Sequence, residues 1–233
     1  MKKCLEISNS ISSILFWSIM SFILVASIVL LYFTNKDLYM FLSQEDSFFE
    51  NATAILYFVA GSLLIISSLS KVKRSKIFWK EILTLLLGLF FMFIAGEEIS
   101  WGQRIFNLGT PEILKEYNVQ NEITIHNIKF LSNSFSVHRL LNIFGLLNGI
   151  VFPLLYNFNK SFRKLLNILN FPIVPLSCSV LFGIAILYEI IISELYHHWV
   201  HAEVKEYLFS VGFFIFSISL YRGKNRLEDR HPA

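Results

Sequence analysis

Six long apolar segments divide this chain, and each has about the length that a membrane-spanning helix requires. Such a helix needs about 20 mostly apolar residues to cross the hydrocarbon core of a bilayer. The segments lack the alternation of apolar and polar residues that is typical of membrane β-strands. They cover roughly residues 11–33, 52–70, 78–96, 140–157, 171–194 and 204–221. Hydrophobic residues make up 55% of the chain, more than a soluble domain usually carries. The sequence predicts an all-α, polytopic membrane bundle of six transmembrane helices in a single domain, residues 1–233.

Basic and acidic residues alternate along the flanks of the six segments. Fourteen of the 20 Lys and Arg residues lie before the first segment, between the second and third, between the fourth and fifth, or after the sixth. Because Lys and Arg favour cytoplasmic loops, we predict that both termini are cytoplasmic and that the acidic loops are extracytoplasmic. This bias accounts for the net charge of +3. No basic stripe indicates a nucleic-acid partner, and the expected partner is the lipid bilayer.

One exported loop, residues 97–138, is much longer than the others. Connections of this length are usually functional or disordered, and the many apolar residues in this one favour a folded loop. Thr110, Pro111 and Glu112 are typical of a helix start, because they supply an N-cap, a first-turn proline and an acid at the positive end of the helix dipole. We therefore predict a short interfacial helix from Thr110 to about Tyr117.

The outer end of the third segment carries the first cluster of candidate site residues. Glu97 and Glu98 are adjacent carboxylates at an apolar boundary, which is costly unless a cation, a metal or a shared proton compensates them. If the helix continues, Glu97, Trp101 and Arg104 share one face. We interpret Glu97 and Glu98 as catalytic bases or ligands, and Trp101, Gln103 and Arg104 as binding residues. The alternative is an interfacial anchor that serves the membrane alone.

A second polar cluster lies farther along the exported loop. It contains His126, interpreted as a catalytic candidate because an imidazole among apolar neighbours needs a partner. The predicted binding residues around it are Asn118, Gln120, Glu122 and Asn127. Ordinary turn formation explains the Asn and Gln residues equally well.

A third cluster follows the fifth segment. On a continuous helix, Glu194, His197 and His201 fall at positions i, i+3 and i+7, and the two histidines have the spacing that lets imidazoles share a metal. Carboxylate with histidine suits Zn, Fe or Mn, whereas a solvated histidine-rich loop is the simpler alternative. Glu189 lies inside the apolar segment, where a carboxylate costs about 2.5–3.5 kcal/mol. We expect it to face inward, paired, as a binding residue.

Parts of these clusters resemble a known pattern. The match covers most of residues 45–130 and includes the patch Glu45-Asp46 with Thr53-Ala54. The string GEEISWGQR (residues 96–104), followed by TPE, NxQxE and HN, resembles the signature of a family of bacterial multi-pass membrane proteins of unknown function. The resemblance implies a multi-pass protein of the bacterial plasma membrane and no known reaction.

A weaker likeness is to the alkaline ceramidase and progestin-receptor-like membrane hydrolases. Ser134 with His138 and His197 with His201 are similar to the Ser-x-x-x-His and His-x-x-x-His elements with which those proteins bind zinc, together with an Asp. The chain departs from that superfamily in two respects. It has six apolar segments instead of seven helices, and no Asp lies between Asp46 and Asp229 to complete the zinc site.

These features leave three functional hypotheses. The first is a metal-assisted hydrolase or transferase at the outer leaflet, acting on a lipid or lipid-linked substrate. The second is a non-catalytic partner or assembly subunit that docks through the exported loop. The third is an ion-coupled transporter with Glu189 and the histidines as a relay, although carriers usually have inverted repeats, and none is visible here.

Overall fold

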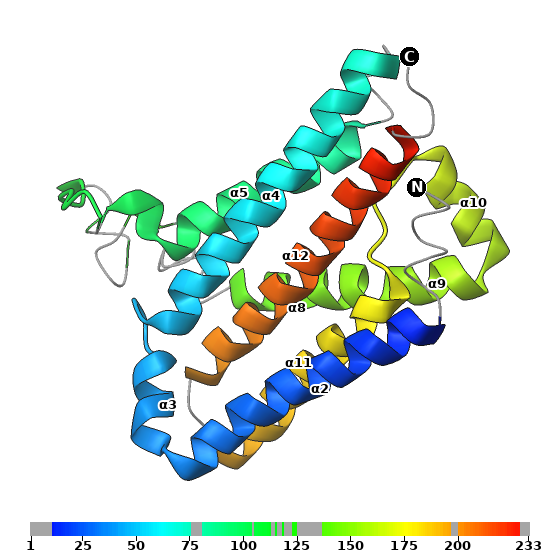
Figure 1. The fold of residues 1–233 in the computed structure, drawn as a ribbon. Helices are drawn as coiled ribbons and strands as arrows, with labels where there is room; N and C mark the ends of the chain where they lie inside the picture. The colour runs from blue at the N-terminus through cyan, green and yellow to red at the C-terminus, as the bar shows by residue number, and fades with distance from the viewer. Residues whose placement is uncertain are drawn as a thin grey trace.

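The computed structural model describes residues 11–75, 81–103, 105–112, 115, 118, 123–124, 137–196 and 200–228. The regular elements in these ranges are helices, which confirms the all-α prediction (Figure 1). In chain order they are α2 (Ile11–Thr34), α3 (Lys36–Leu42), α4 (Phe48–Ser75), α5 (Ile82–Glu98), the 3-10 helix η2 (Ser100–Gly102), α8 (Val137–Leu146), the π-helix η3 (Leu147–Val151), α9 (Phe152–Phe158), α10 (Lys160–Ile168), α11 (Leu176–Tyr196) and α12 (Val200–Glu228).

All six apolar segments coincide with helical regions, and four of these regions have the length and composition of membrane spans. The four are Ile11–Thr34, Phe48–Ser70, Arg139–Phe158 and His201–Arg222. The apolar part of α11, Leu176–Ile192, is shorter, and α5 has 17 residues. The number of spans predicted from the sequence, six, therefore stays a prediction.

Several segment starts differ from the sequence-based expectation, and the second helix begins at Phe48, four residues before the predicted start at 52. The fifth helix begins at Leu176 instead of near residue 171, because Pro172 and Pro175 disfavour helical geometry in the residues that precede them. The sixth begins at Val200, four residues before the predicted start at 204. Consequently the polar residues 201–206, which were expected in a loop or at a segment boundary, belong to the first two turns of α12.

Helix α12 lies at the centre of the bundle, packed against α4 on one side and α11 on the other (Figure 1). Aromatic side chains fill its surroundings. The Phe213 ring lies with its centroid 4.9 Å from that of Phe91, 4.8 Å from that of Phe182 and 5.4 Å from that of Phe144. Offset and edge-on aromatic pairs of this kind contribute stability beyond their buried area. These aromatic contacts hold α12 in place at a point farther along the helix than its polar first turns.

Small residues let α4 and α5 pack closely side by side. A Cβ added at Gly61 would lie 2.7 Å from the carbonyl oxygen of Gly88, so only glycine fits there. Close approach through small residues is the common way in which helices associate inside a membrane. The outer helix α2 packs along α11 and leaves most of its large apolar side chains exposed, as a lipid-facing helix would.

Candidate functional site

Polar side chains gather at one end of the bundle, where α12 begins and where α5 and α11 end, toward the left of Figure 1. The first two turns of α12 contribute His201, Glu203, Lys205 and Glu206. His201 and Lys205 are four residues apart and share one face of the helix, whereas Glu203 and Glu206 are three apart and share another. The two faces meet different neighbours.

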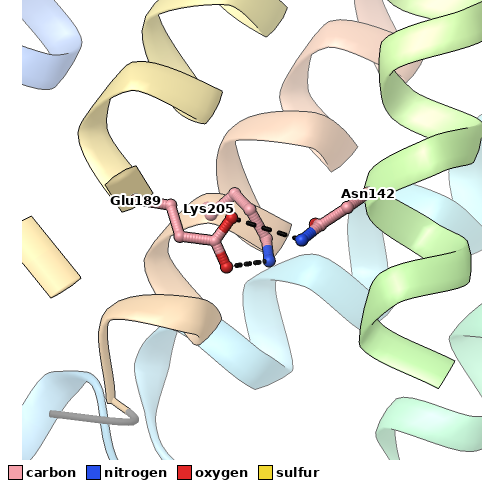
Figure 2. Close-up of polar contacts among 3 residues, drawn as sticks. All are labelled: Asn142, Glu189 and Lys205. Carbon is pink, nitrogen blue, oxygen red and sulfur yellow. Dashed lines mark hydrogen bonds and ion pairs between the residues drawn. The ribbon is translucent and has the colours of Figure 1, made fainter. Parts of the chain in front are cut away.

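One side of α12 forms a buried ion pair. The Lys205 ammonium, whose side chain is fully buried, lies 2.7 Å from Oε1 of Glu189 on α11. Asn142 on α8 donates from Nδ2 to the other carboxylate oxygen of Glu189 at 3.3 Å (Figure 2). Glu189 was expected to face inward and to have a partner, and in the structure Lys205 is that partner. Its predicted binding role stays a prediction.

His201 belongs to a second network, which it forms with two tyrosine hydroxyls. The Tyr39 hydroxyl lies 2.7 Å from Nδ1 of His201 and 2.6 Å from the hydroxyl of Tyr188. Tyr39 is on α3, so this network joins α3 to α11 and α12. Burial raises the pKa of the Tyr39 hydroxyl, which keeps it protonated and able to donate a hydrogen bond.

The continuous helix assumed for Glu194, His197 and His201 is not present. Helix α11 ends at Tyr196 and α12 begins at Val200, so the i, i+3, i+7 geometry expected for a histidine-based metal site does not apply. The physical reason is that the two helices form a hairpin and run side by side. His197 and the side chain of Glu194 lie outside the described residues.

A third group of side chains brings three carboxylates together. Glu98, at the end of α5, meets Glu203 and Glu206 of α12, and one ligand oxygen of each lies within 4.8 Å of the others. Glu206 is buried, and the other two are partly buried. We call Glu98, Glu203 and Glu206 the carboxylate cluster. Only Glu98 of the three was a sequence-based site candidate.

The surroundings of the carboxylate cluster make it electrostatically costly. Loss of solvation raises the pKa of Glu98 well above its ordinary value, and the negative charges of Glu206, Glu203, Glu50 and Glu97 raise it further. Like charges in a poorly solvated place disfavour ionisation of each other. The cluster therefore favours whatever neutralises it, either protons or a cation.

Helix α4 presents one face to this cluster. Glu50 and Tyr57 both interact electrostatically with members of the cluster, and Thr53 shares their face at i+3 from Glu50. The Thr53 side chain is fully buried, and its hydroxyl oxygen has no hydrogen-bond partner within the described ranges. A buried hydroxyl without a partner costs about 1–3 kcal/mol.

The chain turns sharply after α5, so the helix does not continue through Trp101 as considered above. Ser100, Trp101 and Gly102 have φ angles of 47°, 53° and 77°, and non-glycine residues in this left-handed region are uncommon and costly. The turn nevertheless brings the Trp101 indole back to the helix, where its N–H donates to Oε1 of Glu97 at 2.6 Å. Arg104 lies outside the described residues.

Two predicted binding residues make contacts within the loop that follows α5. Gln103 donates to the Thr110 hydroxyl at 2.6 Å and accepts from the backbone N–H of Ile123, also at 2.6 Å. Asn118 is buried and donates to the backbone oxygen of Thr124 at 3.0 Å. These contacts give both side chains a structural role in the loop.

The remaining loop candidates are not described. His126, Gln120, Glu122 and Asn127 lie outside the described residues, as does most of the predicted interfacial helix. At its start, the backbone N–H of Lys115 donates to the oxygen of Pro111 at 3.1 Å, which is one bond of helical type.

No family model, no curated protein and no solved structure matches the chain, and the resemblance over residues 45–130 stays a prediction.

Proposed function

We propose that this protein is a cation-dependent hydrolase or transferase embedded in a membrane, with the carboxylate cluster as its metal-binding centre. The single observation that carries the proposal is the convergence of Glu98, Glu203 and Glu206 within 4.8 Å, inside a helical bundle. The substrate class is a lipid or lipid-linked molecule, because the centre lies at the end of apolar helices. Only such molecules are concentrated at that level.

The donor set selects the kind of cation. Carboxylate and hydroxyl oxygens are hard ligands that suit Mg²⁺, Mn²⁺ or Ca²⁺. The three carboxylates of the cluster supply oxygen ligands alone. A bound divalent cation also offsets the repulsion among the carboxylates, which is a further gain in free energy. Of the metals considered from the sequence, Mn²⁺ fits this donor set and Zn²⁺ fits it less well, because zinc prefers nitrogen and sulfur ligands.

The chemistry follows from the cation and its neighbours. Glu98, Glu203 and Glu206 would hold the cation, which would supply Lewis-acid activation of water and of a substrate oxygen. Glu97, whose carboxylate accepts a hydrogen bond from the Trp101 indole, would take the proton of the attacking water and return it to the leaving oxygen as the bond from phosphorus or carbon to that oxygen breaks. In a transfer reaction, the hydroxyl of an acceptor takes the place of water.

The membrane placement is part of the same proposal. The alternation of basic and acidic flanks supports six spans with both termini cytoplasmic and the carboxylate cluster on the extracytoplasmic side of a bacterial plasma membrane. In the structure, the start of α2 and the end of α12 lie toward the same side of the bundle (Figure 1), and the cluster lies toward the other. That arrangement is the one this topology requires.

The test is a Mn²⁺ titration of chelator-treated protein in mild detergent, followed by calorimetry and by the loss of the free-ion electron paramagnetic resonance signal. We expect one ion per chain, and loss of binding in Glu98→Gln and Glu206→Gln. Glu112→Gln is the matched control, because Glu112 is an exposed acid of the exported loop. Folded wild-type protein without bound Mn²⁺, Mg²⁺ or Ca²⁺ would refute the proposal and favour a non-catalytic partner subunit.

A further inference from the structure

The loop that follows α5 displays large apolar side chains on its outer surface. Trp101 is 48% exposed, Ile105 69%, Phe106 71% and Leu108 52%. We call these four side chains the apolar loop face. In a loop surrounded by water, four such side chains in eight residues would be unfavourable, because exposed apolar surface orders or excludes water at a free-energy cost.

Hydrogen bonds give the described part of the loop, residues 101–103 and 105–110, a defined backbone path. Backbone bonds join Phe106 N–H to the Gly102 oxygen at 2.9 Å and Leu108 N–H to the Gln103 oxygen at 2.8 Å. The Gln103 side chain closes the loop by donating to the Thr110 hydroxyl at 2.6 Å. These bonds pair polar groups within the loop, while the four apolar side chains stay exposed.

The apolar loop face continues an exposed stripe of α5. Leu86, Leu89 and Phe93 lie at i, i+3 and i+7 on that helix and are all exposed, so they share one face. The Phe93 and Trp101 rings pack edge to face with centroids 5.7 Å apart. An exposed apolar stripe on a membrane-spanning helix faces acyl chains. The apolar loop face extends this stripe, so it is in position to contact lipid as well.

We propose that the apolar loop face inserts into the lipid bilayer, at the boundary between head groups and acyl chains. The occupant of this surface is membrane lipid, and tryptophan is the side chain most typical of that depth. The inference rests on the membrane insertion in the proposed function, but not on the cation or the reaction. Through the Trp101–Glu97 bond, the inserted loop is joined directly to a carboxylate beside the carboxylate cluster.

The test places an environment-sensitive fluorophore at single cysteines in a background of Cys4→Ser and Cys178→Ala. The variants are Phe106→Cys in the apolar loop face, Glu112→Cys as an exposed polar site of the same loop, and Leu89→Cys on the α5 stripe. Each labelled protein is reconstituted into vesicles of phosphatidylcholine and phosphatidylglycerol. Quenching is measured with lipids that carry a nitroxide near the head group and, separately, with aqueous iodide.

We expect the label at position 106 to have blue-shifted emission and to be quenched by the nitroxide lipid several-fold more than the label at position 112. Iodide should show the reverse order. If the label at 106 behaves like that at 112 while the label at 89 is quenched by lipid, the inference is wrong and membrane insertion stands. A label at 106 shielded from both quenchers also overturns it, because protein then covers the face. If the label at 89 also fails to contact lipid, the proposed membrane placement itself fails.

Discussion

The first two turns of α12 have two sides, and the charged side chains on these sides meet opposite kinds of neighbour. On one side of α12, Lys205 meets Glu189 at 2.7 Å and the pair is electrically neutral. On the other side, Glu203 and Glu206 meet Glu98, a third carboxylate. A pair of opposite charges neutralises itself, whereas neighbouring carboxylates disfavour one another's ionisation and favour protons or a cation. The contrast separates a contact that assembles the bundle from the acidic group on which the proposed function rests.

The neutral side gives the largest expected effect on substitution. Lys205→Met leaves the Glu189 carboxylate without its cation inside the bundle. Removing one partner of a fully buried ion pair costs about 3–5 kcal/mol, and the 25% exposure of the Glu189 side chain puts this pair at the lower end of that range. We expect a loss of that size in the free energy of unfolding, measured by denaturant titration in detergent micelles.

The matched control for that variant removes both charges. Lys205→Met combined with Glu189→Gln should recover most of the lost stability, because replacing a whole buried pair is often neutral. A single Lys205→Met variant as stable as the wild type would show that this side does not depend on the ion pair.

On the acidic side of α12, we expect removal of a charge to raise the free energy of unfolding instead of lowering it. Two unit charges at the 4.8 Å limit of the cluster repel by about 3 kcal/mol at an effective dielectric constant of about 20. Glu98→Gln removes one charge, so we expect metal-free protein at pH 8 to gain about 1–3 kcal/mol of unfolding free energy. A loss of stability in this variant would mean that protein contacts already neutralise the cluster, and the contrast between the two sides would disappear.

A pH series sharpens the same contrast without changing the covalent structure. The folded-state pKa of Glu98 is raised well above its ordinary value of 4.5, so between those two values the folded protein binds more protons than the unfolded chain. The stability that Glu98 contributes is therefore complete below pH 4.5 and falls as the pH rises through the raised folded pKa. We expect metal-free wild type to lose stability over this window relative to Glu98→Gln, by an amount no larger than the gain in that variant.

The smallest effect is expected at the edge of the neutral side. Asn142 donates to Glu189 at 3.3 Å, a longer contact than the 2.7 Å ion pair. Asn142→Ala should lower the free energy of unfolding by about 1 kcal/mol or less. An effect as large as that of Lys205→Met would show that the amide, and not the ammonium, holds the Glu189 carboxylate.

The helices were largely predictable from the sequence, since a continuous apolar run of sufficient length has few alternatives to a helix in a membrane. The pairing of Glu189 with Lys205 had a signal that the sequence analysis did not use. The two positions lie eight residues on either side of residue 197, at the α11–α12 connection, so an antiparallel hairpin places them at similar heights. That symmetry would have identified Lys205, a base within an otherwise acidic flank, as the partner.

The carboxylate cluster had no comparable local signal. Glu98 and Glu206 are far apart in the chain, and their meeting depends on how α5 and α12 pack in the bundle. The sequence indicated that Glu98 needed a partner. It did not indicate whether that partner was Arg104, a histidine or a site shared with two further acids. The contact of Tyr39 with His201 was equally hidden, because α3 is a short helix whose position depends on its neighbours.

The π-helix η3, Leu147–Val151, has a consequence for chains of altered length. It lies between α8, which carries Asn142, and α9, which begins at Phe152 just before Pro153. A π-helical turn holds about one residue more than an α-helical turn, because its backbone bonds join residues i and i+5. Deleting one residue of η3 should therefore turn it into ordinary α-helix and leave Asn142 facing Glu189. The same deletion within α8, between Asn142 and η3, removes no surplus residue and would rotate Asn142 by about 100° around the helix axis.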